Sequence, residues 1–202
     1  MIYDISQELF SCRVFPGDPA PERQRLLSLE DGQSCNLTAL SLCAHNGTHV
    51  DAPFHFLPDG RTIDQLGLAP FVGPCRVFRH SGAVTAADAE RMLAAASEGR
   101  LLIAGPATVT AEAARVFAAA KLLLLGNESQ TVGPEDAPRE VHLLLLGAGT
   151  ALLEGVVLDG VPEGRYLLNA APLNLGGCDG APCRAWLMTA EELSLLLHSH
   201  SI

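Results

Sequence analysis

Residues 45–55 read His45-Asn46-Gly47-Thr48-His49-Val50-Asp51-Ala52-Pro53-Phe54-His55 and contain three of the seven histidines of the chain. Imidazole and carboxylate groups together are ligands of divalent transition metals, zinc and manganese among them. The three histidines and the aspartate all have odd numbers, so an extended backbone would direct their side chains to one face. The residues between them are mostly apolar or β-branched and would face the other way. The segment therefore predicts one face for chemistry and one for packing.

The spacing of His45 and His49 restricts the backbone. In a straight strand these residues would lie about 13 Å apart, at about 3.3 Å per residue, whereas each ligand bonds a metal at about 2.0–2.2 Å. A helix would bring them together, but Gly47, Pro53 and the β-branched residues between them disfavour a helix. We therefore expect a strand end that curls at Gly47, forming an irregular metal loop that His45 enters and Asp51 leaves.

Length and composition indicate a single domain over residues 1–202. A chain of 202 residues, 48% of them hydrophobic, can bury a substantial core. No apolar run approaches the ~20 residues of a membrane span and no signal peptide is evident at the N-terminus, so we expect a cytoplasmic protein. The net charge of −10 argues against nucleic acid as a partner, because phosphate binding requires a basic surface.

The six cysteines are scattered and form no CxxC pair. In a cytosolic chain of this size we expect them to be reduced and structural. Cys178 and Cys183 lie in a loop rich in glycine and proline, which leaves a zinc or redox role for this pair as the alternative.

Three helices are predicted, each following a threonine that can act as an N-cap. These threonines are Thr85, Thr110 and Thr189, and each is followed by alanine. Glu192, three residues after Thr189, would complete a capping box there.

Short apolar runs bounded by glycine, proline or charge predict buried strands. They cover residues 101–104, 122–125 and 151–158, and two further strands are expected at 10–14 and 38–42. Residues 141–146 are ambiguous between strand and helix, because a run of that length carries no decisive period. Strands with helices in the middle and at the C-terminus indicate a mixed α/β fold with a central sheet.

His142 and Glu154 are the candidate ligands outside the first motif. His142 opens an apolar run and Glu154 is flanked by apolar residues on both sides, so both are expected to be at least partly buried. A buried charge persists when it is paired or coordinates a metal. A satisfied core histidine and a surface glutamate are the alternatives.

The run from His45 to His55 resembles the signature of the cyclase family of metal-dependent hydrolases, which includes the bacterial kynurenine formamidases and the isatin hydrolases. Phe15-Pro-Gly-Asp-Pro resembles that family's Trp-Pro-Gly-Asp element, and the twelve-residue step from His142 to Glu154 also fits. Further matches extend to Asp179-Gly-x-Pro-x-Arg184. The resemblance covers most of the chain. It implies a swivelling β/β/α fold with a barrel-like mixed sheet and flanking helices, assembled as a homodimer or larger homo-oligomer.

The resemblance also implies a dinuclear site of zinc or manganese. Residue by residue, it makes His45, His49 and Asp51 ligands of one ion. Asp51 would bridge to a second ion held by His142 and Glu154. A shared carboxylate holds two cations about 3.5–4 Å apart, where water loses a proton near neutral pH.

The resemblance assigns two further roles. His55 matches the position that the formamidases use as an acid/base group, which would deliver a proton to the leaving atom; a packing role beside Pro53 and Phe56 is the alternative. Phe15 stands where the family has a tryptophan that lines the substrate pocket.

The implied function is hydrolysis of a small-molecule amide, with N-formylkynurenine giving kynurenine and formate in tryptophan catabolism. Two alternatives stay open from the residues. One is hydrolysis of a cyclic amide or lactone, as in the isatin hydrolases. The other is a catalytically silent member that binds a metal or a small molecule.

Overall fold

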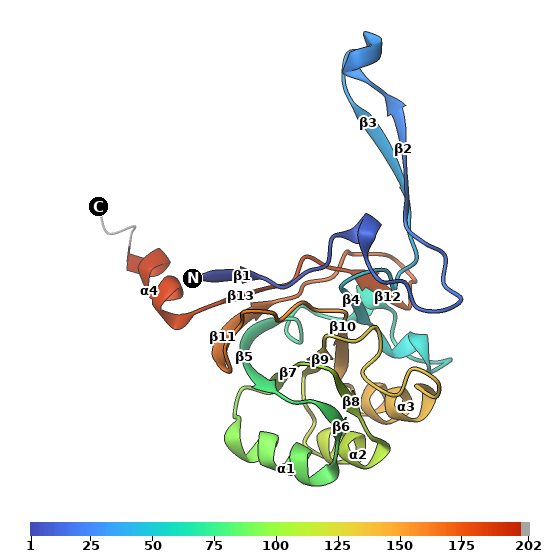
Figure 1. Cartoon of the computed structure of the whole chain (residues 1–202). Coiled ribbons are helices and arrows are strands. Elements are labelled where there is room, and N and C mark those ends of the chain that lie inside the picture. The colour runs from blue at the N-terminus through green and yellow to red at the C-terminus, as the bar shows by residue number, and fades with distance from the viewer. Residues whose placement is uncertain (199–202) are drawn as a thin grey trace.

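A computed structural model of the chain, described here for residues 1–198, has a strongly curled sheet of nine strands as its frame (Figure 1). From edge to edge the strands are β1 (Ile2–Asp4), β13 (Trp186–Met188), β11 (Gly164–Asn169), β5 (Val72–Arg79), β7 (Arg100–Ala104), β9 (Leu124–Asn127), β10 (Ala151–Glu154), β4 (His49–Asp51) and β12 (Gly180–Pro182). The four strands from β5 to β10 pair in parallel and the outer pairs are antiparallel. The expected mixed α/β class with a barrel-like sheet is confirmed.

Four α-helices lie within residues 1–198: α1 (Ala86–Ala95), α2 (Ala111–Ala119), α3 (Arg139–Gly147) and α4 (Ala190–His198). The first three flank the parallel part of the sheet, and α4 lies at the far end beside β1 (Figure 1). The ambiguous run at 141–146 belongs to α3, and its buried face packs in the layer between helices and sheet. None of the helices in this part of the chain is long and apolar enough to cross a membrane.

The helix starts follow the predicted threonines. Thr85 accepts a hydrogen bond from the Asp88 backbone, and Thr110 accepts one from Ala113. The capping box predicted at Thr189 is only half formed. Thr189 accepts from the Glu192 N–H at 3.3 Å, but the Glu192 carboxylate pairs with the amino group of Met1 at 2.9 Å. A charged partner therefore replaces the backbone N–H that the box requires.

The predicted strands are shifted by a few residues or confirmed. Residues 101–104 fall in β7, and 38–41 of the predicted run 38–42 fall in β3 (Leu37–Ser41). The run 122–125 begins two residues before β9, and only the first half of 151–158 is strand β10. A strand at 10–14 was wrong: a short 3₁₀ turn, Leu9–Ser11, and an irregular segment occupy it. Within residues 1–198 no strand pairs with that segment, so its β-forming residues have no ladder to join.

The apolar side chains form two layers, one on each face of the sheet. One cluster fills the inside of the curl and includes Val50, Leu102, Leu153 and Leu187. The other lies between the sheet and helices α1–α3 and includes Phe117. Residues 101–104 of β7 and 151–153 of β10 alternate between the two clusters, which explains why these stretches are continuously apolar. All six cysteines lie in the described part of the chain as free thiols.

Two small sheets complete the fold. Strands β6 (Gly82–Val84) and β8 (Ala107–Val109) pair in parallel beside the helices. Strands β2 (Glu22–Leu27) and β3 pair antiparallel and form an arm, residues 22–41, that projects away from the body (Figure 1). Nearly every residue of the two arm strands is exposed, including Leu26 and Leu40.

We expect Gly155→Ala to destabilise the protein more than Gly149→Ala. Both glycines have positive φ (66° and 85°), so both substitutions strain the backbone. A Cβ at Gly155 would also lie 2.6 Å from the carbonyl oxygen of Gly47, whereas at Gly149 nothing lies within 4 Å. Overpacking adds about 1–3 kcal/mol. Chemical denaturation of the two variants measures the difference, and equal losses would contradict the packing argument.

Candidate metal centre

The register of three strands brings the first site residues together. Strand β4 lies between β10 and β12, with His49 opposite Glu154 and Asp51 opposite Gly180. Residues opposite each other in a sheet share a face, as do residues two apart on one strand. His49, Asp51 and Glu154 therefore project to the same side, and all three are buried.

The predicted curl is present. Gly47 adopts φ of 64°, and the chain bends there before entering β4. The bend brings the ring of His45 to 5.1 Å from the ring of His49, measured between centroids, where a straight strand would separate them by about 13 Å. His45 Nδ1 lies 2.9 Å from Asp51 Oδ1. Asp51, however, belongs to strand β4 rather than to the irregular loop, because both neighbouring strands pair with it.

The two buried imidazoles from opposite sides of the cluster are oriented in the same manner. His49 Nδ1 lies 3.0 Å from the carbonyl oxygen of Gly47, and His142 Nδ1 lies 2.8 Å from that of Pro138, one turn earlier along α3. A carbonyl only accepts, so Nδ1–H donates in both rings. In both, Nε2 is therefore the nitrogen that faces the carboxylates of Asp51 and Glu154, at 3.2–3.5 Å.

The charges of the cluster are strongly coupled. Burial by itself would lower the pKa of His49 and His142, but hydrogen bonds to Asp51 and Glu154 outweigh it and raise each pKa to about 10. His45 behaves in the same way, through Asp179 and Asp51. Burial raises the pKa of Asp51, yet the three imidazoles hold it well below its usual range. The two buried carboxylates thus attract positive charge.

The donor set fits a divalent cation. Asp51 Oδ2 is buried and has no hydrogen-bond partner among residues 1–198, which is costly for a carboxylate oxygen unless a cation approaches it. Two groups of donor atoms lie within 4.8 Å of one another: His45, Asp51 and His55, and His49, Asp51 and Glu154. Asp51 belongs to both groups. Imidazole nitrogens fixed by a second hydrogen bond, with carboxylate oxygens, are a typical set for zinc or manganese.

His55 lies at the edge of the cluster, in the short 3₁₀ turn Pro53–His55 that follows β4. Its ring stacks on His45 with centroids 4.0 Å apart, and its side chain is 28% exposed. It is the most accessible imidazole of the cluster. His55 Nδ1 lies 3.3 Å from Asp179 Oδ2.

Asp179 is the site residue that the sequence analysis did not single out. Its Oδ2 lies 3.0 Å from His45 Nε2 as well as near His55. Hydrogen bonds from these two imidazoles hold the pKa of Asp179 well below its usual range. The sequence analysis included Asp179 in the Asp179-Gly-x-Pro element that resembles the family. The position of an aspartate in a loop does not predict which histidines its carboxylate contacts.

A cavity of about 200 Å³ opens beside the cluster, and the structure places all but one of the expected site residues in its wall. Its lining consists of Phe15, Asp18, His45, His49, His55, Phe56, Gln130, Thr131, Pro138, His142 and Glu154. Asp51, the exception, lies behind them at the centre of the cluster. Phe15 is held by a turn in which Asp18 N–H donates to its carbonyl and Gly17 has φ of 100°. The cavity is smaller than the roughly 300–1,000 Å³ of typical drug-sized ligand sites, so it restricts its ligand to a small molecule.

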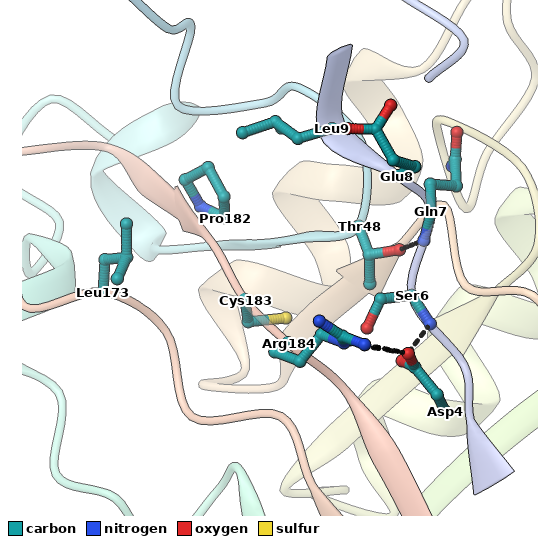
Figure 2. Close-up of a pocket in the computed structure, with 10 residues that line it drawn as sticks. All are labelled: Asp4, Ser6, Gln7, Glu8, Leu9, Thr48, Leu173, Pro182, Cys183 and Arg184. Atoms are coloured by element: carbon teal, nitrogen blue, oxygen red, sulfur yellow. Dashed lines mark hydrogen bonds and ion pairs between the residues drawn. The ribbon is translucent and has the colours of Figure 1, made fainter. Parts of the chain in front are cut away.

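A second, larger cavity of about 470 Å³ shares no lining residue with the first (Figure 2). Its wall contains the exposed ion pair of Arg184 with Asp4, and Thr48, which accepts a hydrogen bond from the backbone N–H of Gln7. Thr48 also donates to the carbonyl of Gly155 at 2.6 Å. The even-numbered residues from 46 to 52 are buried away from the metal cavity, as the alternation predicted. Phe54 was also expected on the packing face but is 41% exposed, because the chain leaves the extended conformation for the 3₁₀ turn at Pro53.

Comparisons with known proteins agree on one family. The Cyclase family model, described as "Putative cyclase", matches residues 3–132. A kynurenine formamidase of Salinibacter ruber is 36% identical over 214 residues, covering 95% of this chain and 99% of that protein. Another kynurenine formamidase, from Sphingopyxis alaskensis, is 36% identical over 202 residues, covering 92% and 97%.

Two solved structures share the fold. A potential metal-dependent hydrolase with cyclase activity has a TM-score of 0.80 at 28% identity, over 93% of this chain and 96% of that one. An isatin hydrolase bound to thioisatinate also has a TM-score of 0.80, at 20% identity, over 93% and 92%. The expected cyclase-like fold is confirmed.

We expect Zn²⁺ or Mn²⁺ to raise the thermal stability of protein stripped with a chelator. An ion that binds only the folded state, at 100 times its dissociation constant, adds about 2.7 kcal/mol. Differential scanning calorimetry with and without the ion measures the gain. Asp51→Asn keeps the shape of the side chain but removes the shared charge, so its gain should be much smaller. An equal gain in that variant would contradict the placement of the ion.

Proposed function

The chain belongs to the cyclase family of metal-dependent hydrolases, and from this we propose that it hydrolyses N-formylkynurenine to kynurenine and formate, a step of tryptophan catabolism. It is a hydrolase of a carbon–nitrogen bond other than a peptide bond. One observation carries the proposal: a buried group of imidazoles and carboxylates borders a small cavity, with a partly exposed imidazole, His55, at its edge. Curated relatives 34–36% identical over nearly their whole length bear the name kynurenine formamidase.

The residues proposed to hold the metal are His45, His49, Asp51, His142 and Glu154. We propose two ions, zinc or manganese, because Asp51 belongs to both groups of converging donors and His142 Nε2 lies 3.4 Å from its second oxygen. A divalent ion bound there would lower the pKa of a water molecule and polarise the amide carbonyl.

Proton transfer and substrate binding are proposed for side chains that do not bind the metal. Water gives up one proton as its oxygen bonds to the formyl carbon, and the bond from that carbon to nitrogen breaks. Formic acid leaves and ionises to formate, and the nitrogen takes up a proton. His55 is proposed to deliver that proton, because it is an imidazole at the cavity wall and reaches solvent. Phe15 and Phe56 supply apolar walls that suit the aromatic ring of the substrate.

We expect His55→Ala and His49→Ala to separate proton transfer from metal binding. His55→Ala should keep its metal and lose about 10²- to 10⁴-fold in kcat, the usual contribution of a general acid or base. His49→Ala should lose both metal and activity, because its Nε2 faces both carboxylates. Elemental analysis and the absorbance of released kynurenine measure the two quantities. Loss of metal from His55→Ala would instead make His55 a ligand.

A substrate panel tests the alternatives. Metal-loaded protein that opens a cyclic amide or a lactone but leaves N-formylkynurenine intact would replace the proposed reaction by ring opening. Metal-loaded protein that cleaves no amide or ester would indicate a binding member of the family.

We further propose a single domain over residues 1–202 that acts in the cytoplasm as a homodimer or larger homo-oligomer. The arm of β2 and β3 supports the assembly. An isolated two-stranded hairpin is marginally stable in water, and four of its leucines are 47–58% exposed. A second copy related by two-fold symmetry would cover both arms at once. The arm begins after the Phe15 turn and ends before His45, so covering it would also order two walls of the cavity.

We expect the double variant Leu26→Ser/Leu40→Ser to shift the protein toward monomer, because it removes apolar area from the arm. Sedimentation velocity over a range of concentrations measures the shift. Leu123→Ser, at an exposed leucine outside the arm, is the matched control and should leave the assembly unchanged. An unchanged assembly in the arm variant would exclude the arm as the contact.

A further inference from the structure

We propose that Asp179 is a positioning residue that holds the proton-carrying His55 and the metal-facing His45 with one carboxylate oxygen. The inference rests on the proposed function for the role of His55, but the contacts that support it belong to the fold. Asp179 would act on the reaction through the two imidazoles and would touch neither ion nor substrate.

The contacts converge on one atom. Asp179 Oδ2 lies 3.0 Å from His45 Nε2 and 3.3 Å from His55 Nδ1. The two rings lie against each other with centroids 4.0 Å apart and an interplanar angle of 30°. The stack and the shared oxygen together define the plane and the rotation of His55, whose side chain is otherwise 28% exposed.

The backbone around Asp179 is fixed by the sheet. Its carbonyl accepts a hydrogen bond from the Ala52 N–H at 2.8 Å, and the carbonyl of Cys178 accepts one from Ile63 at 2.9 Å. Strand β12 begins at Gly180, where a Cβ would lie 2.7 Å from the carbonyl oxygen of Val50 and 2.9 Å from His45 Cε1. Glycine therefore lets β12 approach β4 and the His45 ring closely, and this approach delivers the preceding carboxylate to both imidazoles.

The chemistry of the acceptor sets the protonation of both rings. An ionised carboxylate has no hydrogen to donate, so His45 Nε2 and His55 Nδ1 are the donors. By the same rule His45 Nδ1 donates to Asp51 in this structure, 2.9 Å away, and a metal ion at Asp51 would replace that hydrogen while Asp179 keeps the Nε2 proton. His55 is left with Nε2 as the nitrogen that exchanges a proton. Without Asp179, the partly exposed His55 ring could rotate and adopt either tautomer.

Asp179→Asn, which keeps the side-chain shape, tests the proposal in the metal-loaded enzyme. With N-formylkynurenine and saturating Zn²⁺, we expect kcat to fall about 10- to 100-fold while KM changes less than about threefold. Affinity for Zn²⁺ alone, measured by competition with a chelator, should fall by a similar factor, as is usual for carboxylates behind a metal-binding histidine. Long-range ¹H–¹⁵N spectra should show His55 losing its single tautomer.

Asp64→Asn is the matched control. Asp64 accepts a hydrogen bond from the Gly177 N–H at 2.9 Å, so it supports the same loop without reaching either imidazole. This variant should keep kcat, Zn²⁺ affinity and the His55 tautomer, which separates positioning from a general loosening of the loop. A comparable loss in Asp64→Asn would overturn the proposal, and circular dichroism identifies a variant that has not folded.

Three other outcomes would overturn the role of Asp179. Wild-type kcat, Zn²⁺ affinity and tautomer in Asp179→Asn would make the contact incidental. Complete loss of Zn²⁺ from that variant would make Asp179 a ligand. A mixed tautomer already present in the wild type would remove the ordering argument. If the wild type does not cleave N-formylkynurenine, the proposed function fails, but Zn²⁺ affinity and the tautomer spectra still decide the role of Asp179.

Discussion

Two buried carboxylates, Asp51 and Glu154, lie on neighbouring strands, β4 and β10, near one edge of the sheet, and much of the surrounding structure compensates their charge. A buried ion without a partner costs about 3–5 kcal/mol, which is a large part of the stability of a domain. Three imidazoles surround the pair, and the backbone N–H of Val132 donates to Glu154 at 2.8 Å. Among residues 1–198 the arrangement still leaves one oxygen of Asp51 without a hydrogen bond, which fits the cation proposed to bind there.

The same strand connects this charge cluster to the stability of the fold. His49 and Asp51 project from one face of β4 toward the site, and His45 reaches the same site from the bend before the strand. On the other face, Val50 belongs to the apolar core, and Thr48 bonds the carbonyl of Gly155, the residue that follows Glu154. Glycines at 155 and 180 allow β10 and β12 to approach the segment from both sides. The distances among His49, Asp51 and Glu154 are thus set by strand pairing and packing rather than by a loop.

The histidines of the cluster differ in burial, and this difference matches the roles proposed for them. His49 and His142 are almost fully buried and are held by carbonyl oxygens, which suits groups that keep one orientation. His55 lies at the cavity edge with access to solvent, which suits a group that must gain and lose a proton in each cycle. Asp179 contacts the imidazoles of both regions, because His45 lies between the buried centre and His55. The side chains proposed to bind the metal and the side chain proposed to transfer the proton are therefore adjacent but different.

Local sequence determined the features that depend on a few neighbouring residues. The alternation in residues 45–55, the bend at Gly47 and the threonine caps at Thr85 and Thr110 follow from backbone geometry alone, and the structure contains each of them. Resemblance to a family, rather than spacing, connected His142 and Glu154 to that motif. Apolar runs indicated buried segments. The run at 141–146 fitted either a strand or a helix, and the structure shows a helix whose buried face packs against the sheet.

Tertiary structure decided whatever depends on residues far apart in the chain. The amino group of Met1 pairs with Glu192, the residue that the capping box at Thr189 required. Within residues 1–198 no strand pairs with residues 10–14, where a strand was expected. Asp179 meets His45 across 134 positions, through strand pairing that no local pattern encodes. The sequence by itself therefore determined which chemical groups this protein carries and on which face. Only the folded sheet decided which of them meet, because register and burial are properties of the whole chain.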